Sequence, residues 1–242
     1  MKRPPGGDRA PSSVAARWRG TYTRPTVSAP ATVTDVLDAA AVRAALGRCR
    51  LVVERHGAWL TRLDAVLGDG DHGDNLVIGF RAVDDMLGAM PDKMLPGDLL
   101  RAVGHRLVSA VGGASGPLYG TAFLEAGARA DDALTLDGGT VADMLTAAAD
   151  GLARRGRSAV GDKTILDTLA PAAVAFSEAI AAGASPRMAT GRAVRAGARG
   201  ARSTRAMVAR RGLALRLGER SAGHLDPGAV SCLLLLRALG GR

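Results

Sequence analysis

From Val33 onward, apolar residues recur at intervals of three and four along nearly the whole chain, and this periodicity constrains the fold more than any other feature. Such spacing places apolar side chains on one face of an α-helix, whereas a half-buried strand requires strict alternation. The clearest case is a long run that ends at Gly68. Its predicted buried face comprises Val42, Leu46, Cys49, Val53, Leu60, Leu63 and Leu67. No segment alternates for long, so the sequence predicts an all-α protein.

Seven further helices are predicted after the first one, at about 75–90, 96–111, 115–130, 138–155, 163–183, 186–210 and 227–239. Eight helices with short connections favour an up-and-down antiparallel bundle or barrel. Residues 1–32 are rich in Pro, Gly, Ser and Arg and lack an apolar period, so we expect a basic, mobile tail there. Residues 33–242 form the predicted helical domain.

The net charge of +9 is weak evidence for a nucleic-acid partner. Arginine accounts for 29 of the 32 basic residues, and Ala and Gly are abundant, which resembles the drift of a GC-rich coding sequence. Aromatic residues make up only 3% of the chain, so few side chains could stack on bases. Nucleic-acid binding is therefore the less favoured interpretation.

Ten arginines and one acidic residue lie between positions 187 and 220. Four of these arginines share a helical face by their spacing, namely Arg192, Arg195, Arg199 and Arg202. They form either a solvated face or a docking surface for an acidic partner.

Several features point to a cytoplasmic protein without a membrane partner. No stretch approaches the ~20 apolar residues that a membrane-spanning helix needs. The basic N-terminus lacks the apolar core of a secretory signal. Cys49 and Cys232 lie far apart and match no metal-binding or redox spacing, so both are expected to be buried free thiols.

The connection GDGDHGDN at 68–75 is the most informative segment. Asp64 precedes it in the last turn of the first helix, where its charge meets the negative end of the helix dipole. Asp69 and Asp71 alternate with glycines that allow the loop to fold back, so all three carboxylates can point to one place. A divalent cation such as Mg²⁺ would balance their charge through oxygen ligands. A solvated turn with ordinary helix caps is the alternative.

Three other connections carry more Gly, Asp, Ser and His than a helix turn needs. They read GGASGPLYG at 112–120, VGDKT at 160–164 and GERSAGHLDPGA at 218–229. Small residues before a helix permit close approach of a phosphate, although a close helix crossing also favours them. Lys163 is expected either to meet a phosphate or to face solvent. Asp226 is expected either to cap the last helix or to help orient a nucleotide.

In this order and spacing, the motifs GDGDHGDN, GGASGPLYGT, GDKT and GERSAGHLDPGA resemble the nucleotide-binding L subunit of dihydroxyacetone kinases. The resemblance covers roughly residues 35–240. It implies an eight-helix up-and-down barrel that binds ADP or ATP with Mg²⁺ at one end. It also implies a phosphotransferase with an alcohol group as acceptor. Metal ions and positioning carry phosphoryl transfer, so no residue of this chain is expected to act as a covalent catalyst.

The resemblance further implies a set of site residues. The Mg²⁺ ligands would be Asp64, Asp69 and Asp71. The residues that would line the nucleotide site are His72, Gly73, Asp74, Asn75, Ala114, Ser115, Gly156, Ile165, Asp226, Pro227 and Gly228.

The family also implies a partner chain. A separate K subunit or domain holds the sugar in this family, and the chain is too short to contain it. Activity is therefore expected to require a K-type partner that presents a small ketose or related hydroxyl-bearing substrate. The phosphoryl donor would be either exchangeable ATP or a phosphocarrier protein that recharges bound ADP, and a homodimer is left open.

Two positions depart from the family pattern. Where the family commonly reads Gly-Arg-Ala-Ser, this chain reads GLAL at 212–215, so Leu213 replaces an arginine that contacts the nucleotide. Arg211 or Arg216 could supply the missing charge. Asp74 stands where an apolar residue is frequent. These departures leave a second interpretation open, a nucleotide-binding relative with a regulatory role or a place in another biosynthetic pathway, without triose kinase activity.

Overall fold

The computed structural model describes residues 36–241, which contain eight α-helices and, in place of strands, one isolated bridge between Leu37 and Leu136. The helices are α2 (Ala39–Leu67), α3 (His72–Ala89), α4 (Pro96–Ala110), α5 (Ser115–Ala130), α6 (Gly138–Gly156), α7 (Leu166–Ala181), α8 (Pro186–Ser203) and α9 (Pro227–Leu239). Two 3₁₀ segments, η1 (Thr204–Ala206) and η2 (Leu213–Ser221), separate α8 from α9. The all-α prediction is confirmed. The predicted tail at 1–32 lies outside the described residues.

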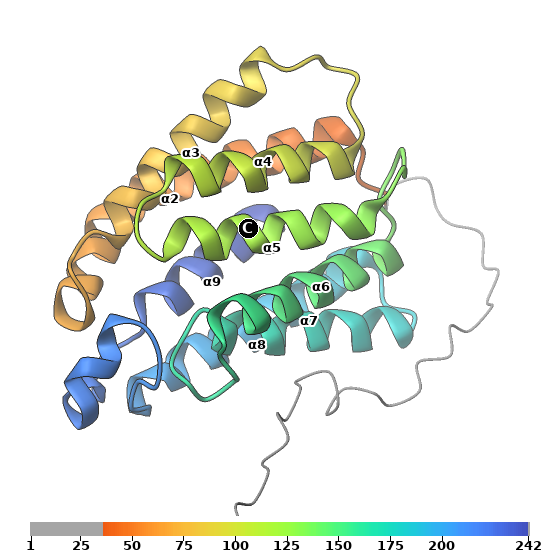
Figure 1. Cartoon of the computed structure of the whole chain (residues 1–242). Helices are drawn as coiled ribbons and strands as arrows, with labels where there is room; N and C mark the ends of the chain where they lie inside the picture. Colours follow the sequence, from red (N-terminus) through yellow and green to blue (C-terminus); the bar gives the residue numbers. More distant parts are fainter. Residues whose placement is uncertain (1–35, 242) are drawn as a thin grey trace, which may run out of the picture. The chain divides into compact units, whose positions relative to one another are not determined.

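Each helix packs against the next one along the chain, and α9 packs against α2, which closes the helices into a ring (Figure 1). The connections alternate between the two ends of this ring, as an up-and-down topology requires. The predicted bundle or barrel is therefore confirmed.

Helix α2 supplies the longest side of the core. It begins after Asp38, whose carboxylate accepts a hydrogen bond from the Ala41 amide at 2.8 Å. Of the seven residues predicted for its buried face, six are buried and Leu63 is half-buried. The 3.6-residue period was therefore sufficient to find this face.

Helix α8 is shorter than predicted and packs unusually closely against α7. The predicted helix at 186–210 ends at Ser203, where the chain passes into the 3₁₀ segment η1. Beyond this end, the Thr204 and Met207 carbonyl groups accept hydrogen bonds from the Lys163 side chain. Pro171 lies inside α7 and cannot donate to the Asp167 carbonyl. Gly200 of α8 packs against that carbonyl so closely that any Cβ atom there would clash with it.

Both cysteines are buried inside the ring. Cys49 and Cys232 are 0% and 5% exposed, and burial raises the pKa of each thiol to about 12. This agrees with the prediction of buried free thiols. A cavity of about 340 Å³ lies among the helices, with an apolar lining that includes Phe123, Met144 and Leu235. Within 36–241, no helix has the length and apolar character needed to cross a membrane.

Candidate functional site

The connections that carry the sequence motifs meet at one end of the helix ring, at the left in Figure 1. They join α2 to α3, α4 to α5, α6 to α7 and α8 to α9. Because α3, α5, α7 and α9 all begin at this end, four helix N-termini lie there with amides that make no bond inside their helices. Such amides and the positive end of the helix dipole favour anions.

Asp64 organises the loop between α2 and α3. Its side chain is buried in the last turn of α2, and Oδ2 accepts hydrogen bonds from three backbone amides. These are the amides of Gly70 at 3.0 Å, Asp71 at 3.1 Å and His72 at 3.3 Å. Gly70 has a φ of +76°, a left-handed conformation that glycine adopts without strain, so the chain can fold back here.

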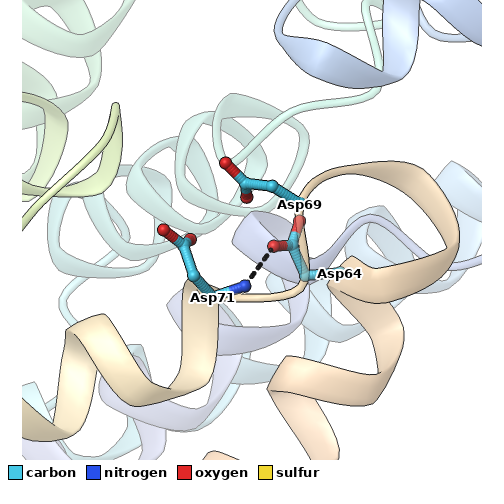
Figure 2. Close-up of side chains that lie close together, drawn as sticks. All are labelled: Asp64, Asp69 and Asp71. Atoms are coloured by element: carbon cyan, nitrogen blue, oxygen red, sulfur yellow. Dashed lines mark hydrogen bonds between the residues drawn. The ribbon is translucent and has the colours of Figure 1, made fainter.

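Asp69 and Asp71 complete an acidic cluster with Asp64. One carboxylate oxygen of each residue lies within 4.8 Å of the others. Figure 2 shows the Asp69 and Asp71 carboxyl groups extending to the same side of the loop. Partial desolvation raises the pKa of Asp71, and the charges of Asp69 and Asp64 act in the same direction, while a hydrogen bond from Asn75 opposes them. The cluster thus concentrates negative charge, as the sequence predicted. Asp74 is exposed on α3 and lies outside this cluster.

His72 ties three helix starts together. It is buried, and its Nδ1 lies 2.9 Å from the Ser115 hydroxyl at the start of α5. Its Nε2 lies 2.8 Å from the Ser231 hydroxyl on α9, which also lies 2.7 Å from the Tyr119 hydroxyl. Burial lowers the pKa of His72, which favours the neutral ring. Ser231 and Tyr119 were missed from the sequence, since an isolated Ser in an apolar helix gives no signal of a bonded partner.

The α4–α5 connection lies beside the start of α3. A Cβ atom built on Gly112 would be 3.3 Å from the Asn75 side-chain oxygen, and Ser115 bonds to His72. Ala114 is exposed just before α5 begins. The structure therefore brings the first two predicted loops together.

The start of α9 lies beside the α6–α7 connection. A Cβ atom on Gly228 would be 3.6 Å from the backbone nitrogen of Ile165. Asp226 caps α9, because its Oδ2 accepts from the Ala229 amide at 2.7 Å. Burial of this carboxyl group raises its pKa to about 7, against the opposing effect of the cap. The helix-cap interpretation of Asp226 is confirmed.

For two predicted residues the structure shows packing contacts with neighbouring helices or loops. Gly73 is buried against α2, where a side chain would clash with the Gly57 carbonyl oxygen, so its role in the structure is to allow the two helices to meet. Gly156 ends α6, and its nearest neighbours are Ser158 and Leu118.

The same family of proteins emerges from comparison with known sequences. The DAK2 domain profile matches residues 66–241. The chain belongs to the DAK2 domain family. It is 39% identical over 196 residues to the ADP-binding subunit DhaL of the PEP-dependent dihydroxyacetone kinase from Escherichia coli, covering 80% of this chain and 92% of that subunit. It is 38% identical over 208 residues to the corresponding subunit of kinase 2 from Listeria innocua, covering 84% and 94%.

A solved structure shares the fold of this chain. The dihydroxyacetone kinase of C. freundii, in complex with AMP-PNP and Mg²⁺, superposes with a TM-score of 0.65 at 23% identity. The match covers 90% of this chain but only 37% of the kinase chain, so this DAK2 domain spans well under half the length of that protein.

Lys163 of this DAK2 domain meets neither expectation. It was predicted to contact a phosphate or to face solvent, but it is 1% exposed. Its ammonium donates hydrogen bonds to three backbone carbonyl groups, those of Thr204, Met207 and His224. The short GDKT motif could not predict these acceptors, because they lie between 41 and 61 residues further along the chain.

Leu213, which stands in place of the family arginine, lies in the connection between α8 and α9. Leu213 is the first residue of η2 and is 41% exposed, so an arginine at this position would fit without burying its charge. Arg211, one of the two suggested substitutes, has its Nε 3.4 Å from Asp162 Oδ2. Asp162 thus draws Arg211 toward the α6–α7 connection. Arg216 is exposed on η2.

Proposed function

We propose that this chain is the nucleotide-binding subunit of a dihydroxyacetone-type kinase, a phosphotransferase that acts on a small ketose or related alcohol. It would hold ADP or ATP together with Mg²⁺. The observation that carries this proposal is the convergence of the Asp64, Asp69 and Asp71 carboxylates beside four helix N-termini in a DAK2-family chain. The relatives named ADP-binding subunits of dihydroxyacetone kinases support both the ligand and the reaction class.

The donor set of the acidic cluster fits Mg²⁺. All its candidate ligand atoms are carboxylate oxygens, and hard divalent cations prefer such ligands. Asp69 and Asp71 are exposed, so phosphate oxygens could share the cation with them. Asp64 Oδ2 is occupied by three amides, which leaves Oδ1 as its proposed ligand atom. When bound, Mg²⁺ would neutralise negative charge on the transferred group.

The protein's own residues would bind and orient the nucleotide. Amides at the starts of α3, α5 and α9 would donate hydrogen bonds to phosphate oxygens. The neutral His72 would hold these three helix starts in position through Ser115 and Ser231. We propose the following nucleotide-lining residues: His72, Gly73, Asp74, Asn75, Ala114, Ser115, Gly156, Ile165, Asp226, Pro227 and Gly228. No side chain needs to become phosphorylated, because the nucleotide itself carries the phosphoryl group.

A partner chain completes the proposed kinase. The matched relatives from E. coli and L. innocua are subunits that this chain covers almost fully, so we propose that a separate K-type subunit presents the hydroxyl-bearing substrate. These relatives are named as subunits of PEP-dependent kinases, which favours a phosphocarrier protein as the source of the phosphoryl group.

One feature favours the alternative function, nucleotide binding for regulation or for another pathway without triose kinase activity. Leu213 cannot supply the charge of the family arginine, and Arg211 lies against Asp162. A nucleotide would then be held by the acidic cluster and the helix starts alone.

Calorimetric titration of nucleotide-stripped protein with ADP, with and without Mg²⁺, tests the proposed function. Tight binding that requires Mg²⁺ is the expected result, followed by phosphoryl transfer to dihydroxyacetone once a K-type subunit is added. Mg²⁺-dependent binding without transfer would favour the alternative function. Absence of ADP binding under both conditions would contradict both functions.

A further inference from the structure

Lys163 lies at an unusual place in the DAK2 domain. Its side chain is buried, and its backbone has a φ of +62°, in the left-handed region that residues with a side chain rarely adopt. The ammonium donates at 2.7 Å to the Thr204 carbonyl, at 3.3 Å to that of Met207 and at 2.5 Å to that of His224. A lysine ammonium has three N–H groups, and here each of them has an acceptor.

These acceptors lie at the two ends of one segment. We call residues 207–224, which include η2, the 207–224 loop. Met207 is its first residue, Thr204 lies three residues before it, and His224 is its last residue, so a single ammonium joins the two ends of the loop. Arg205 adds two bonds across the same base: its carbonyl accepts from the Gly223 amide at 2.7 Å, and its Nε donates to the Gly223 carbonyl at 3.0 Å.

The 207–224 loop has a small apolar core of its own. Leu67, Ala209 and Ala214 pack together there, with Leu217 at the margin. Leu67 is the last residue of α2, directly before the loop that carries Asp69 and Asp71. The 207–224 loop therefore packs against the base of the acidic cluster.

The opposite side of the loop base is joined to α9. The Asp226 amide donates to the Thr204 hydroxyl at 3.0 Å, and Asp226 in turn caps α9. Any displacement of the loop base would thus be transmitted to the start of α9, which faces Ile165.

Burial of an ammonium is costly, and the left-handed backbone adds to that cost. A structural turn could be built without either feature. We propose that Lys163 is a positioning residue: it clamps both ends of the 207–224 loop and so fixes this loop as one side of the nucleotide site, between the acidic cluster and the start of α9. This inference rests on the proposed function, because it assigns the loop to the same site.

The test compares Lys163→Met with a matched control, Lys93→Met, in the full chain. Lys93 is exposed in the connection between α3 and α4, at the opposite end of the ring. Hydrogen exchange measures the stability of the 207–224 loop, and calorimetry with ADP and Mg²⁺ measures the site, both well below the melting temperature. Lys163→Arg, which retains a cation with several donors, serves as the conservative variant.

For Lys163→Met we expect amide exchange about tenfold or more faster within 207–224, with the connection at 131–137 unchanged. The Kd for ADP with Mg²⁺ should rise about tenfold or more, while Lys93→Met matches the wild type in both measurements. Lys163→Arg should recover part of the loop protection and part of the affinity. A folded Lys163→Met protein with wild-type ADP affinity would overturn the inference.

Two further results separate this inference from the proposed function. If the wild type does not bind ADP, the proposed function fails, whereas the exchange comparison still shows whether Lys163 holds the loop. If Lys163→Met does not fold, amide hydrogen exchange of the wild type, measured with and without ADP and Mg²⁺, tests whether the 207–224 loop belongs to the nucleotide site. Slower exchange within 207–224 on binding is expected, and unchanged exchange there would refute the assignment of the loop to the site.

Discussion

His72 Nε2 on α3 and Ser231 Oγ on α9 lie 2.8 Å apart, although 159 residues separate them in sequence. The same hydroxyl lies 2.7 Å from the Tyr119 hydroxyl and donates to the Gly228 carbonyl at 3.0 Å. One buried serine therefore joins α3, α5 and α9 where these helices begin. Since the acidic loop leads directly into His72, the geometry of that loop depends on this serine.

Ser231→Ala should destabilise the fold measurably. The substitution leaves the buried His72 and Tyr119 without their shared partner, which costs about 1–3 kcal/mol. Calorimetry should show a melting temperature lower by roughly 2–4 °C per kcal/mol for a chain of this length. Ser109→Ala is the matched control, because Ser109 is exposed and bonds only within α4. Equal melting temperatures for both variants would contradict the proposed importance of the network.

Gly73→Ala and Gly88→Ala should have effects of opposite sign although both glycines lie in α3. A Cβ atom at position 73 would clash with the Gly57 carbonyl, whereas nothing lies within 4 Å of one at position 88. We expect Gly73→Ala to cost about 1–3 kcal/mol through overpacking. Gly88→Ala should add about 0.5–1 kcal/mol, because alanine restricts the unfolded chain and favours the helix. Urea denaturation would measure both, and a loss of stability in Gly88→Ala would contradict the packing argument.

Asp69→Ala should weaken Mg²⁺-dependent ADP binding by roughly tenfold or more, about 1.4 kcal/mol for each factor of ten. The side chain is exposed and caps no helix, so circular dichroism should show unchanged helix content. Calorimetric titration provides the measurement, with Asp92→Ala in the α3–α4 connection as the control. Wild-type affinity in Asp69→Ala would exclude this residue from the metal site.

Leu213→Arg should tighten ADP binding by about tenfold, the value of a typical charge-assisted hydrogen bond. The side chain at this position is 41% exposed, so the arginine can be added without burying its charge. Leu215→Arg, at a position that is 53% exposed, controls for a general gain of positive charge. If both variants gain equally, nonspecific attraction is the explanation. If neither gains, a neighbouring arginine already supplies the contact.

Stability should fall as pH rises through the titration of Asp226. Its pKa in the folded protein is raised to about 7, so the folded state holds a proton that the unfolded state releases at lower pH. The resulting stability is present below the unfolded pKa and is lost as pH rises toward about 7. Asp226→Asn keeps a capping oxygen but cannot ionise.

We therefore expect Asp226→Asn to exceed the wild type in stability at pH 8 by about 1 kcal/mol, or roughly 2–4 °C in melting temperature. The advantage should shrink at pH 4. Thermal unfolding at both pH values provides the measurement, and an equal difference at both would argue against a raised pKa.

The helices and the acidic cluster were predictable from sequence, but the contacts that hold the site together were not. Apolar periodicity located α2 and its buried face, and Asp-Gly alternation indicated the fold-back at Gly70. Local pattern cannot show which distant carbonyls will meet Lys163, nor that Ser231 will meet His72, because these pairs form only when the ring closes. The prediction for α8 was also too long, since the apolar period does not show the change to the 3₁₀ segment η1 at Thr204.

The two buried thiols offer a native probe for opening of the helix ring. With each pKa raised to about 12 and both side chains inside the ring, alkylating reagents can reach neither Cys49 nor Cys232 in the closed state. Each lies on one of the two helices that close the ring, Cys49 on α2 and Cys232 on α9. The rate at which a maleimide modifies these two cysteines would therefore report how often α2 and α9 separate, without any introduced label.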